Sequence, residues 1–303
     1  MSTLGFGEAG QGMERPVNQR NSTIVKILAL AIAWASTIGG GCSSFRLPAG
    51  VAELPDSHRL HIAPFSISTS FSLTKDDSLV HELVSLRGRV HETLKLPLAS
   101  RQIEIFIFDD RPSYERFIHL HYPELPRRRA FFIAQDQREM VYAYRDDRLD
   151  EDLRHEVCHA LLHATVGVVP LWLDEGLAEY FEVPLEANGT HERHLDELHS
   201  AMQRGWKPSL TRLENLTRVQ DMNGSDYREA WAWVHFLIHG SAEGRQVLLG
   251  YLQDLRTDRC REPISARLFQ VIQRPDSIFA SHIEQLKPTP IEPNSISTSP
   301  AGR

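Results

Sequence analysis

The chain has 303 residues, a formal net charge of −7 at pH 7 and 15 histidines. The negative charge argues against nucleic acid or another polyanion as a partner. The three cysteines, Cys42, Cys158 and Cys260, do not indicate a disulfide, because nothing in the sequence places two of them close together.

The N-terminus has the pattern of a targeting segment. Basic residues precede a twelve-residue apolar run over 27–38, which is short for a membrane span. Three glycines then lead to Cys42, as in a bacterial lipoprotein signal, although Gly39 stands where leucine is usual. We therefore predict a signal peptide over residues 1–41 and a protein of the cell envelope, held at the membrane by a lipid on Cys42. An ordinary secretory signal, giving a periplasmic or secreted protein, and an uncleaved anchor are the alternatives.

Residues 42–58 are expected to form a linker, 59–286 a catalytic domain, and the Pro- and Ser-rich tail 287–303 a disordered end. Hydrophobic periodicity predicts an α+β domain, in which a small mixed sheet precedes a mostly helical half that starts near Leu149. The elements expected before Leu149 are a strand at 62–72, a helix at 78–95, a strand at 102–108, a helix at 113–121, and two strands at 130–134 and 139–144 joined by a hairpin turn.

The segment from Asp152 to His159 contains the pattern His-Glu-x-x-His. Residues four apart share a helix face, so His155 and His159 can present two imidazole nitrogens to one metal ion. Glu156, next to the first ligand, is placed to act on a metal-bound water without being a ligand. Apolar residues at helical spacing form a separate stripe, which leaves these three side chains to face a cleft.

Glu175 lies in a second predicted helix, in the sequence Trp-Leu-Asp-Glu-Gly-Leu-Ala-Glu-Tyr-Phe. Fifteen residues separate it from His159, with Gly167 and Pro170 in the connection, so the two helices must turn tightly back on each other. With Glu175 as third ligand, the set is that of a catalytic zinc site that keeps one position open for water.

These two segments resemble the gluzincin metallopeptidases, above all the peptidase MA-like family, over about residues 100–240. The resemblance implies a zincin-like fold with one zinc ion per chain, bound by His155, His159 and Glu175. It implies that Glu179 accepts a hydrogen bond from a ligand histidine; a solvated carboxylate is the alternative. It also implies that Tyr227 stabilises the oxyanion, although Tyr227 shares a stripe with core residues and can be structural instead, and His235 is the fallback.

The expected reaction is hydrolysis of a peptide bond by metal-bound water, with Glu156 as general base and then general acid. The Gly-x-Met-Glu-Asn segment of aminopeptidases is absent from residues 100–154, which favours an endopeptidase. The strand at 139–144 is a candidate edge strand for pairing with the substrate backbone, with an interior strand as the alternative. Two other functions remain open: a non-catalytic metal-binding module of the envelope, and a zinc hydrolase of a non-peptide amide or ester.

Overall fold

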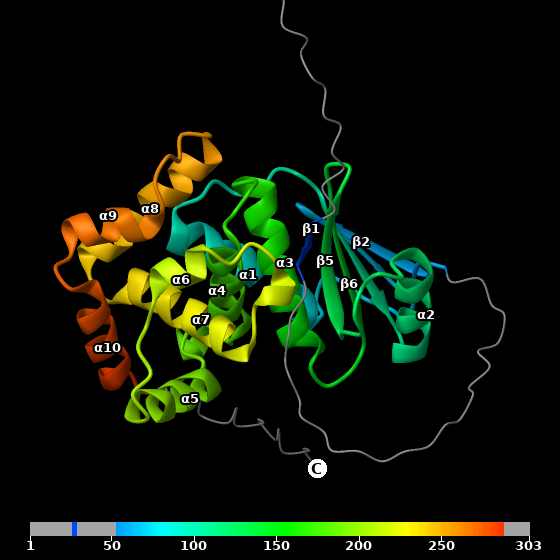
Figure 1. The fold of residues 1–303 in the computed structure, drawn as a ribbon. Coiled ribbons are helices and arrows are strands. Elements are labelled where there is room, and N and C mark those ends of the chain that lie inside the picture. Colours follow the sequence, from blue (N-terminus) through cyan, green and yellow to red (C-terminus); the bar gives the residue numbers. More distant parts are fainter. Residues whose placement is uncertain (1–25, 29–52, 288–303) are drawn as a thin grey trace, which may run out of the picture.

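The computed structural model describes residues 26–28 and 53–287 (Figure 1). Its sheet has the strand order β1-β5-β6-β4-β3-β2. The strands are β1 (Lys26–Leu28), β2 (His58–Ile62), β3 (Phe65–Thr69), β4 (Ile103–Phe108), β5 (Ala130–Gln135) and β6 (Arg138–Tyr144). The predicted cleavage region around Cys42 and the tail from 288 onward lie outside the described residues, so those predictions stay open.

The helices follow two patterns: α1 and α2 connect strands, and the remaining helices follow the sheet in the chain. They are α1 (Ser78–Leu94), α2 (Arg111–His121), α3 (Leu149–Thr165), α4 (Leu171–Glu182), α5 (Glu192–Gln203), α6 (Leu210–Glu214), α7 (Gly224–His239), α8 (Ala242–Arg256), α9 (Ile264–Val271) and α10 (Pro275–Gln285). The predicted α+β order, a small mixed sheet and then a mostly helical half, is confirmed. Within the described part of the chain, no helix is long and apolar enough to cross a bilayer.

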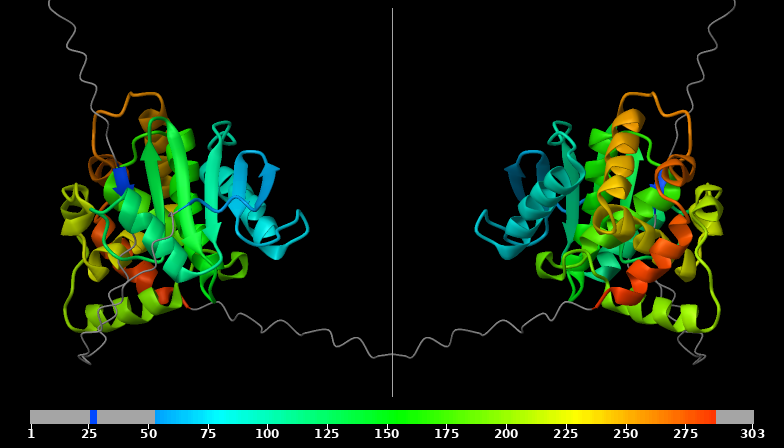
Figure 2. Two further views of the ribbon diagram at one scale, coloured as in Figure 1. Left: turned by 90° about the vertical axis from the view of Figure 1, so that its right-hand side faces the viewer. Right: turned by 90° about the vertical axis from the view of Figure 1, so that its left-hand side faces the viewer.

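The sheet is covered on both faces because its strands carry apolar residues on both sides. In β4, Ile103, Ile105 and Ile107 join the core beneath α1 and α3, whereas Phe106 and Phe108 join a second cluster beneath α2. The helices α4–α10 lie on the far side of α3 from the sheet (Figures 1 and 2). Helix α3 is therefore sandwiched between the sheet and the helical half, and nearly every one of its side chains is buried.

Two predicted strands differ in the structure. The strand expected at 62–72 is the shorter β3, and the strand β2 before it, which pairs with β3 across a turn at Ala63 and Pro64, was not predicted. The strand at 139–144 is β6, and it lies inside the sheet, paired with β4 on one side and β5 on the other. Its assignment as the edge strand is wrong, since the β5–β6 hairpin adds β5 outside it.

Strand β5 lies next to α3, and its outer edge pairs with β1. The hairpin turn between β5 and β6 was predicted correctly: Asp136 and Gln137 have φ values of 52° and 64°. Positive φ at both central residues gives the turn the twist that adjacent antiparallel strands require. The three residues of β1 come from the predicted signal peptide, so a cleavage before Cys42 would remove them and leave the outer edge of β5 uncovered.

A buried group of histidines in the helical half is expected to make the fold sensitive to acid. His235 of α7 is 3% exposed and lies against His239, Tyr180 of α4 and His282 of α10. Burial, followed by the neighbouring His239 and His282, lowers the pKa of His235 to about 2. Burial, with His282 and Arg245 next, lowers the pKa of His239 to about 4.

We expect the free energy of unfolding to decrease as the pH falls below the ordinary histidine value of 6.5. Below that value the unfolded chain binds protons that folded His235 does not, which costs at most about 1.4 kcal/mol per pH unit for this one group. Urea unfolding between pH 7 and pH 4 checks this, with His235→Leu expected to reduce the slope. His119→Leu, at an exposed position of α2, is the matched control, and equal slopes in all three proteins would contradict the expectation.

Candidate metal centre

Two consecutive helices hold the predicted ligands. Helix α3 carries Asp150, Glu151 and Asp152 in its first turn, where negative charge complements the helix dipole. It ends at Thr165, Gly167 turns the chain with a φ of 90°, and α4 begins directly after Pro170. The predicted tight connection is confirmed, and it brings Glu175 alongside the two histidines of α3.

His155, His159 and Glu175 meet in one cluster, and none of them is more than 1% exposed. The two Nε2 atoms are 3.1 Å apart, and Glu175 Oε2 lies 3.6 Å from that of His155 and 3.7 Å from that of His159. Ligands about 2.0–2.1 Å from a tetrahedral zinc ion are about 3.3–3.4 Å apart. The triangle of donor atoms therefore has the size that one zinc ion requires.

The hydrogen bonds behind the two histidines determine where their protons are. His155 Nδ1 donates to Glu182 Oε2 at 2.7 Å, and His159 Nδ1 donates to Asp174 Oδ1 at 3.0 Å. Since neutral imidazole carries one proton, both Nε2 atoms present lone pairs to each other. Neither carboxylate oxygen of Glu175 has a hydrogen-bond partner among the described residues, although both are buried. A cation would satisfy all four atoms, so these residues fit a metal ion.

The carboxylates that orient the ligand histidines differ from the predicted one. Glu179, expected in that role, accepts a hydrogen bond from His194 at 2.8 Å instead. Asp174 also accepts from His163 Nε2 at 2.7 Å, so it links two histidines of α3. Although burial opposes it, contact with His163 and His159 holds the pKa of Asp174 well below its usual range. Asp174 and Glu182 are thus the groups that fix the ligand tautomers.

Glu156 is held against the sheet by β5. Its Oε2 accepts the backbone N–H of Phe132 at 2.7 Å, and the side chain is 1% exposed. Burial raises the pKa of Glu156 to about 8, although Arg128 and the Phe132 amide oppose the shift. A carboxyl group with a pKa near neutrality can both accept and release a proton, as a general base and acid must.

Tyr227 lies near the start of α7 and is 2% exposed. Arg128 is hydrogen-bonded to it and lies close enough to Glu156 and Glu175 for their charges to act on the guanidinium. Arg128 could not be recognised from the sequence, because it lies in a run of three arginines, 127–129, and such a run is typical of a solvated loop. Of its neighbours, Arg127 is exposed, and Arg129 pairs with acidic residues at the base of α3.

His235, the fallback electrophile, lies two turns further along α7 than Tyr227, about 12 Å along the axis. It contacts His282 and the other histidines described above. Cys158 is completely buried in the core, and both it and Cys260 are free thiols, in agreement with the absence of a predicted disulfide.

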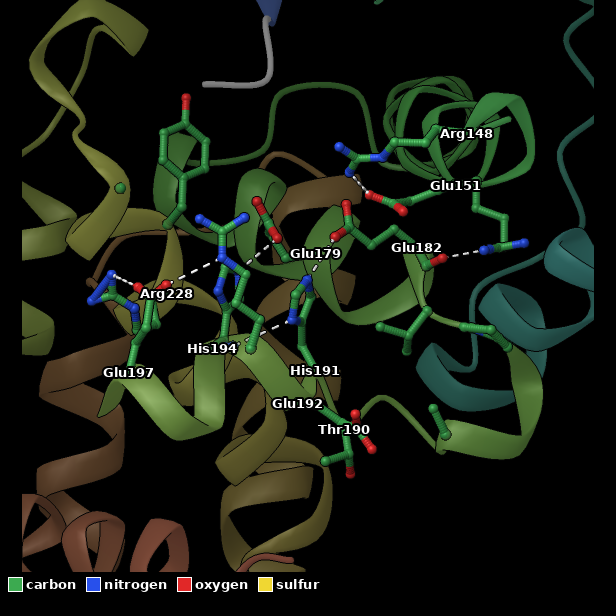
Figure 3. A pocket seen from close by; sticks show the side chains of 17 residues that line it. Arg148, Glu151, Glu179, Glu182, Thr190, His191, Glu192, His194, Glu197 and Arg228 are labelled. Atoms are coloured by element: carbon green, nitrogen blue, oxygen red, sulfur yellow. Dashed lines mark hydrogen bonds and ion pairs between the residues drawn. The ribbon is translucent and has the colours of Figure 1, made fainter. Parts of the chain in front are cut away.

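The cluster of His155, His159 and Glu175 does not face the open cleft that the sequence had predicted for the two histidines. The three residues are enclosed, and a pocket of about 550 Å³ lies beside them, with Glu179, Glu182, His191, His194 and Tyr227 among its lining residues (Figure 3). Glu182 connects the two, because its second oxygen, Oε1, accepts from His191 Nε2 at 3.1 Å on the pocket wall.

No family model matches the chain, and a search of curated proteins finds no significant match. The chemistry of the site is therefore inferred from its own residues and geometry.

Proposed function

We propose that the protein is a zinc-dependent peptidase with a zincin-like catalytic domain. The observation that carries this proposal is Glu175, a fully buried carboxylate with two unpartnered oxygens among the described residues, facing two imidazole lone pairs. Burying a charge without a partner is costly, and burial raises the pKa of Glu175 well above its ordinary value. A divalent cation removes that cost, and the resemblance to gluzincins supports zinc.

Zinc bound by these three residues would supply a Lewis acid that polarises a carbonyl group and lowers the pKa of water. The remaining steps belong to the side chains. Glu156 takes a proton from the attacking water and delivers it to the departing amine. Its hydrogen bond to Phe132 keeps the carboxylate in place during both transfers.

Tyr227 and Arg128 are our candidates for stabilising the negative charge that develops on the carbonyl oxygen. Because Arg128 donates to the tyrosine oxygen, the hydroxyl group can itself donate to an oxyanion. The half-buried cation of Arg128 strengthens any such bond, since charge-assisted hydrogen bonds are stronger than neutral ones.

The substrate is proposed to be a peptide that pairs with the outer edge of β5, which β1 occupies in the structure and which cleavage before Cys42 would uncover. This strand lies beside α3 and supplies the amide that holds Glu156, so a peptide paired there would run close to the base. Export and lipidation at Cys42 remain proposals from the sequence, as does preference for internal peptide bonds.

Metal content tests the proposal without knowledge of the substrate. We expect Glu175→Ala in the full chain to lose one equivalent of zinc relative to wild type, with affinity at that site reduced more than about 100-fold. Mass spectrometry of the metal after dialysis measures this, alongside the control Glu92→Ala, which removes an exposed carboxylate of α1 and leaves the three ligands in place. If the two variants kept the same amount of zinc, Glu175 would not be the third ligand, and the binding-module alternative would be favoured.

A further inference from the structure

A second cluster of metal-ligating side chains lies in the pocket beside the proposed catalytic centre. Glu179, His191 and His194 each offer a donor atom within 4.8 Å of the others. We propose that these residues form a second site for a first-row divalent metal ion such as zinc, distinct from the cluster of His155, His159 and Glu175. This site does not depend on the proposed peptidase activity.

The arrangement of His191 and His194 favours the binding of one metal ion by both rings. Their rings are stacked face to face, with centroids 3.9 Å apart and an interplanar angle of 15° (Figure 3). His194 Nε2 faces Glu179 at 2.8 Å, and His191 Nε2 faces Glu182 at 3.1 Å. The two imidazoles and the carboxylate of Glu179, whose donor atoms lie within 4.8 Å of one another, form a set suited to zinc and neighbouring metals.

The local charge also favours a cation. Glu179 and Glu182 are 5% and 3% exposed, and the side-chain partners of both carboxylates among the described residues are histidines. Among the described residues, none of the four arginines of the pocket wall forms an ion pair with either carboxylate. Arg148 pairs with Glu151, Arg154 with Glu82, and Arg193 and Arg228 with Glu197. A divalent ion would supply positive charge beside these two buried carboxylates.

The pocket provides the route for the ion. The side chains of His191 and His194 are 19% and 14% exposed and open into the pocket, unlike the enclosed cluster on α3. If the metal ion binds Nε2 of each histidine, the proton on that nitrogen moves to Nδ1 of the same ring. His191 Nδ1 can then no longer accept the backbone N–H of His194 at the start of α5, a contact that at 3.4 Å is already long.

Glu182 lies between the two sites and contacts a histidine of each. Its Oε2 accepts a hydrogen bond from His155 Nδ1, and its Oε1 faces His191. A metal ion on His191 Nε2 would replace the hydrogen bond to Glu182 Oε1 and so change the surroundings of the carboxylate that orients His155. Zinc affinity at the first site is therefore expected to depend on occupancy of the pocket site.

The experiment separates the two sites by removing the first one. The full chain, Glu175→Ala, and the double variant Glu175→Ala/His194→Gln are loaded with zinc and dialysed, and bound zinc is counted by mass spectrometry. We expect about two equivalents in wild type, about one in Glu175→Ala and none in the double variant. His199→Ala, on α5 with its ring bound to the carbonyl of Ile283 instead, is the matched control and should keep both equivalents.

Folding of each variant is verified by circular dichroism, and absorption of Co²⁺ in the Glu175→Ala background reports directly on the ligands of the pocket site. One equivalent in wild type and none in Glu175→Ala would overturn the second site while leaving the first intact. An equivalent that survives His194→Gln would also overturn it, because the metal would then lie elsewhere. If Glu175→Ala kept all the zinc of the wild type and the double variant lost one equivalent, the result would support the pocket site and refute the proposed catalytic centre.

Discussion

Glu156→Gln is expected to lower peptide hydrolysis by about 10²–10⁴-fold while leaving the fold and the metal content unchanged. Glutamine has the shape of glutamate, and its carbonyl oxygen can still accept the N–H of Phe132 that now bonds Glu156 at 2.7 Å. The amide cannot take a proton from water, so only the proton transfers are lost. Cleavage of a library of quenched fluorescent peptides, with zinc counted in the same samples, measures both effects.

The matched control is Glu92→Gln, which makes the same chemical change at an exposed position of α1. It should cleave as wild type does. If Glu156→Gln cleaved the same peptides at the wild-type rate, the proposed mechanism would be wrong. If it lost zinc as well as activity, Glu156 would be acting on the metal rather than on the proton.

Gly176→Ala is expected to destabilise the fold by about 1–3 kcal/mol, because it forces two tightly packed helices apart. A Cβ at this position of α4 would lie 2.6 Å from the carbonyl oxygen of Ala230 and 2.9 Å from Cγ2 of Val234, both on α7. The nearer contact is with backbone, which a rotamer change cannot relieve. Urea unfolding at constant zinc concentration measures the loss, and the separation should also weaken zinc binding at the adjacent Glu175.

Gly250→Ala provides the control for this change. Gly250 lies in α8, and a Cβ there would meet nothing within 4 Å. Alanine should stabilise that helix by about 0.5–1 kcal/mol, because it restricts the unfolded chain and favours the helix. Equal stability of Gly176→Ala and Gly250→Ala would show that the α4–α7 contact is looser than the structure indicates.

Several features of the fold and the candidate site could be predicted from the spacing of residues along the chain. The four-residue interval between His155 and His159 places both on one face of any helix, whatever surrounds it. The stop at Gly167 and restart after Pro170 depend on backbone preferences of those two residues alone. Strand β4 was recognised because apolar and polar residues alternate at its start and four apolar residues, 105–108, then follow in succession.

The carboxylates behind the ligands could not be chosen in the same way. Glu175, Glu179 and Glu182 follow one another at intervals of four and three, so they share a face of α4. Either of the last two could therefore orient a histidine. The crossing of α4 over α3 decides the choice, and it puts Glu182 against His155 and turns Glu179 toward α5.

The sequence by itself placed His155, Glu156 and His159 together on one helix and predicted the order of sheet and helices, because these features depend on residue spacing within single elements. Glu175 as the third proposed ligand came from the resemblance to gluzincins. Tertiary structure alone decided that Arg128 and not Arg127 points at the site, that β5 and not β6 is the strand holding Glu156, and that His191 and His194 meet Glu179. Those outcomes depend on contacts between segments far apart in the chain. Local patterns carry no information about such contacts, since the same residues can pack against different neighbours.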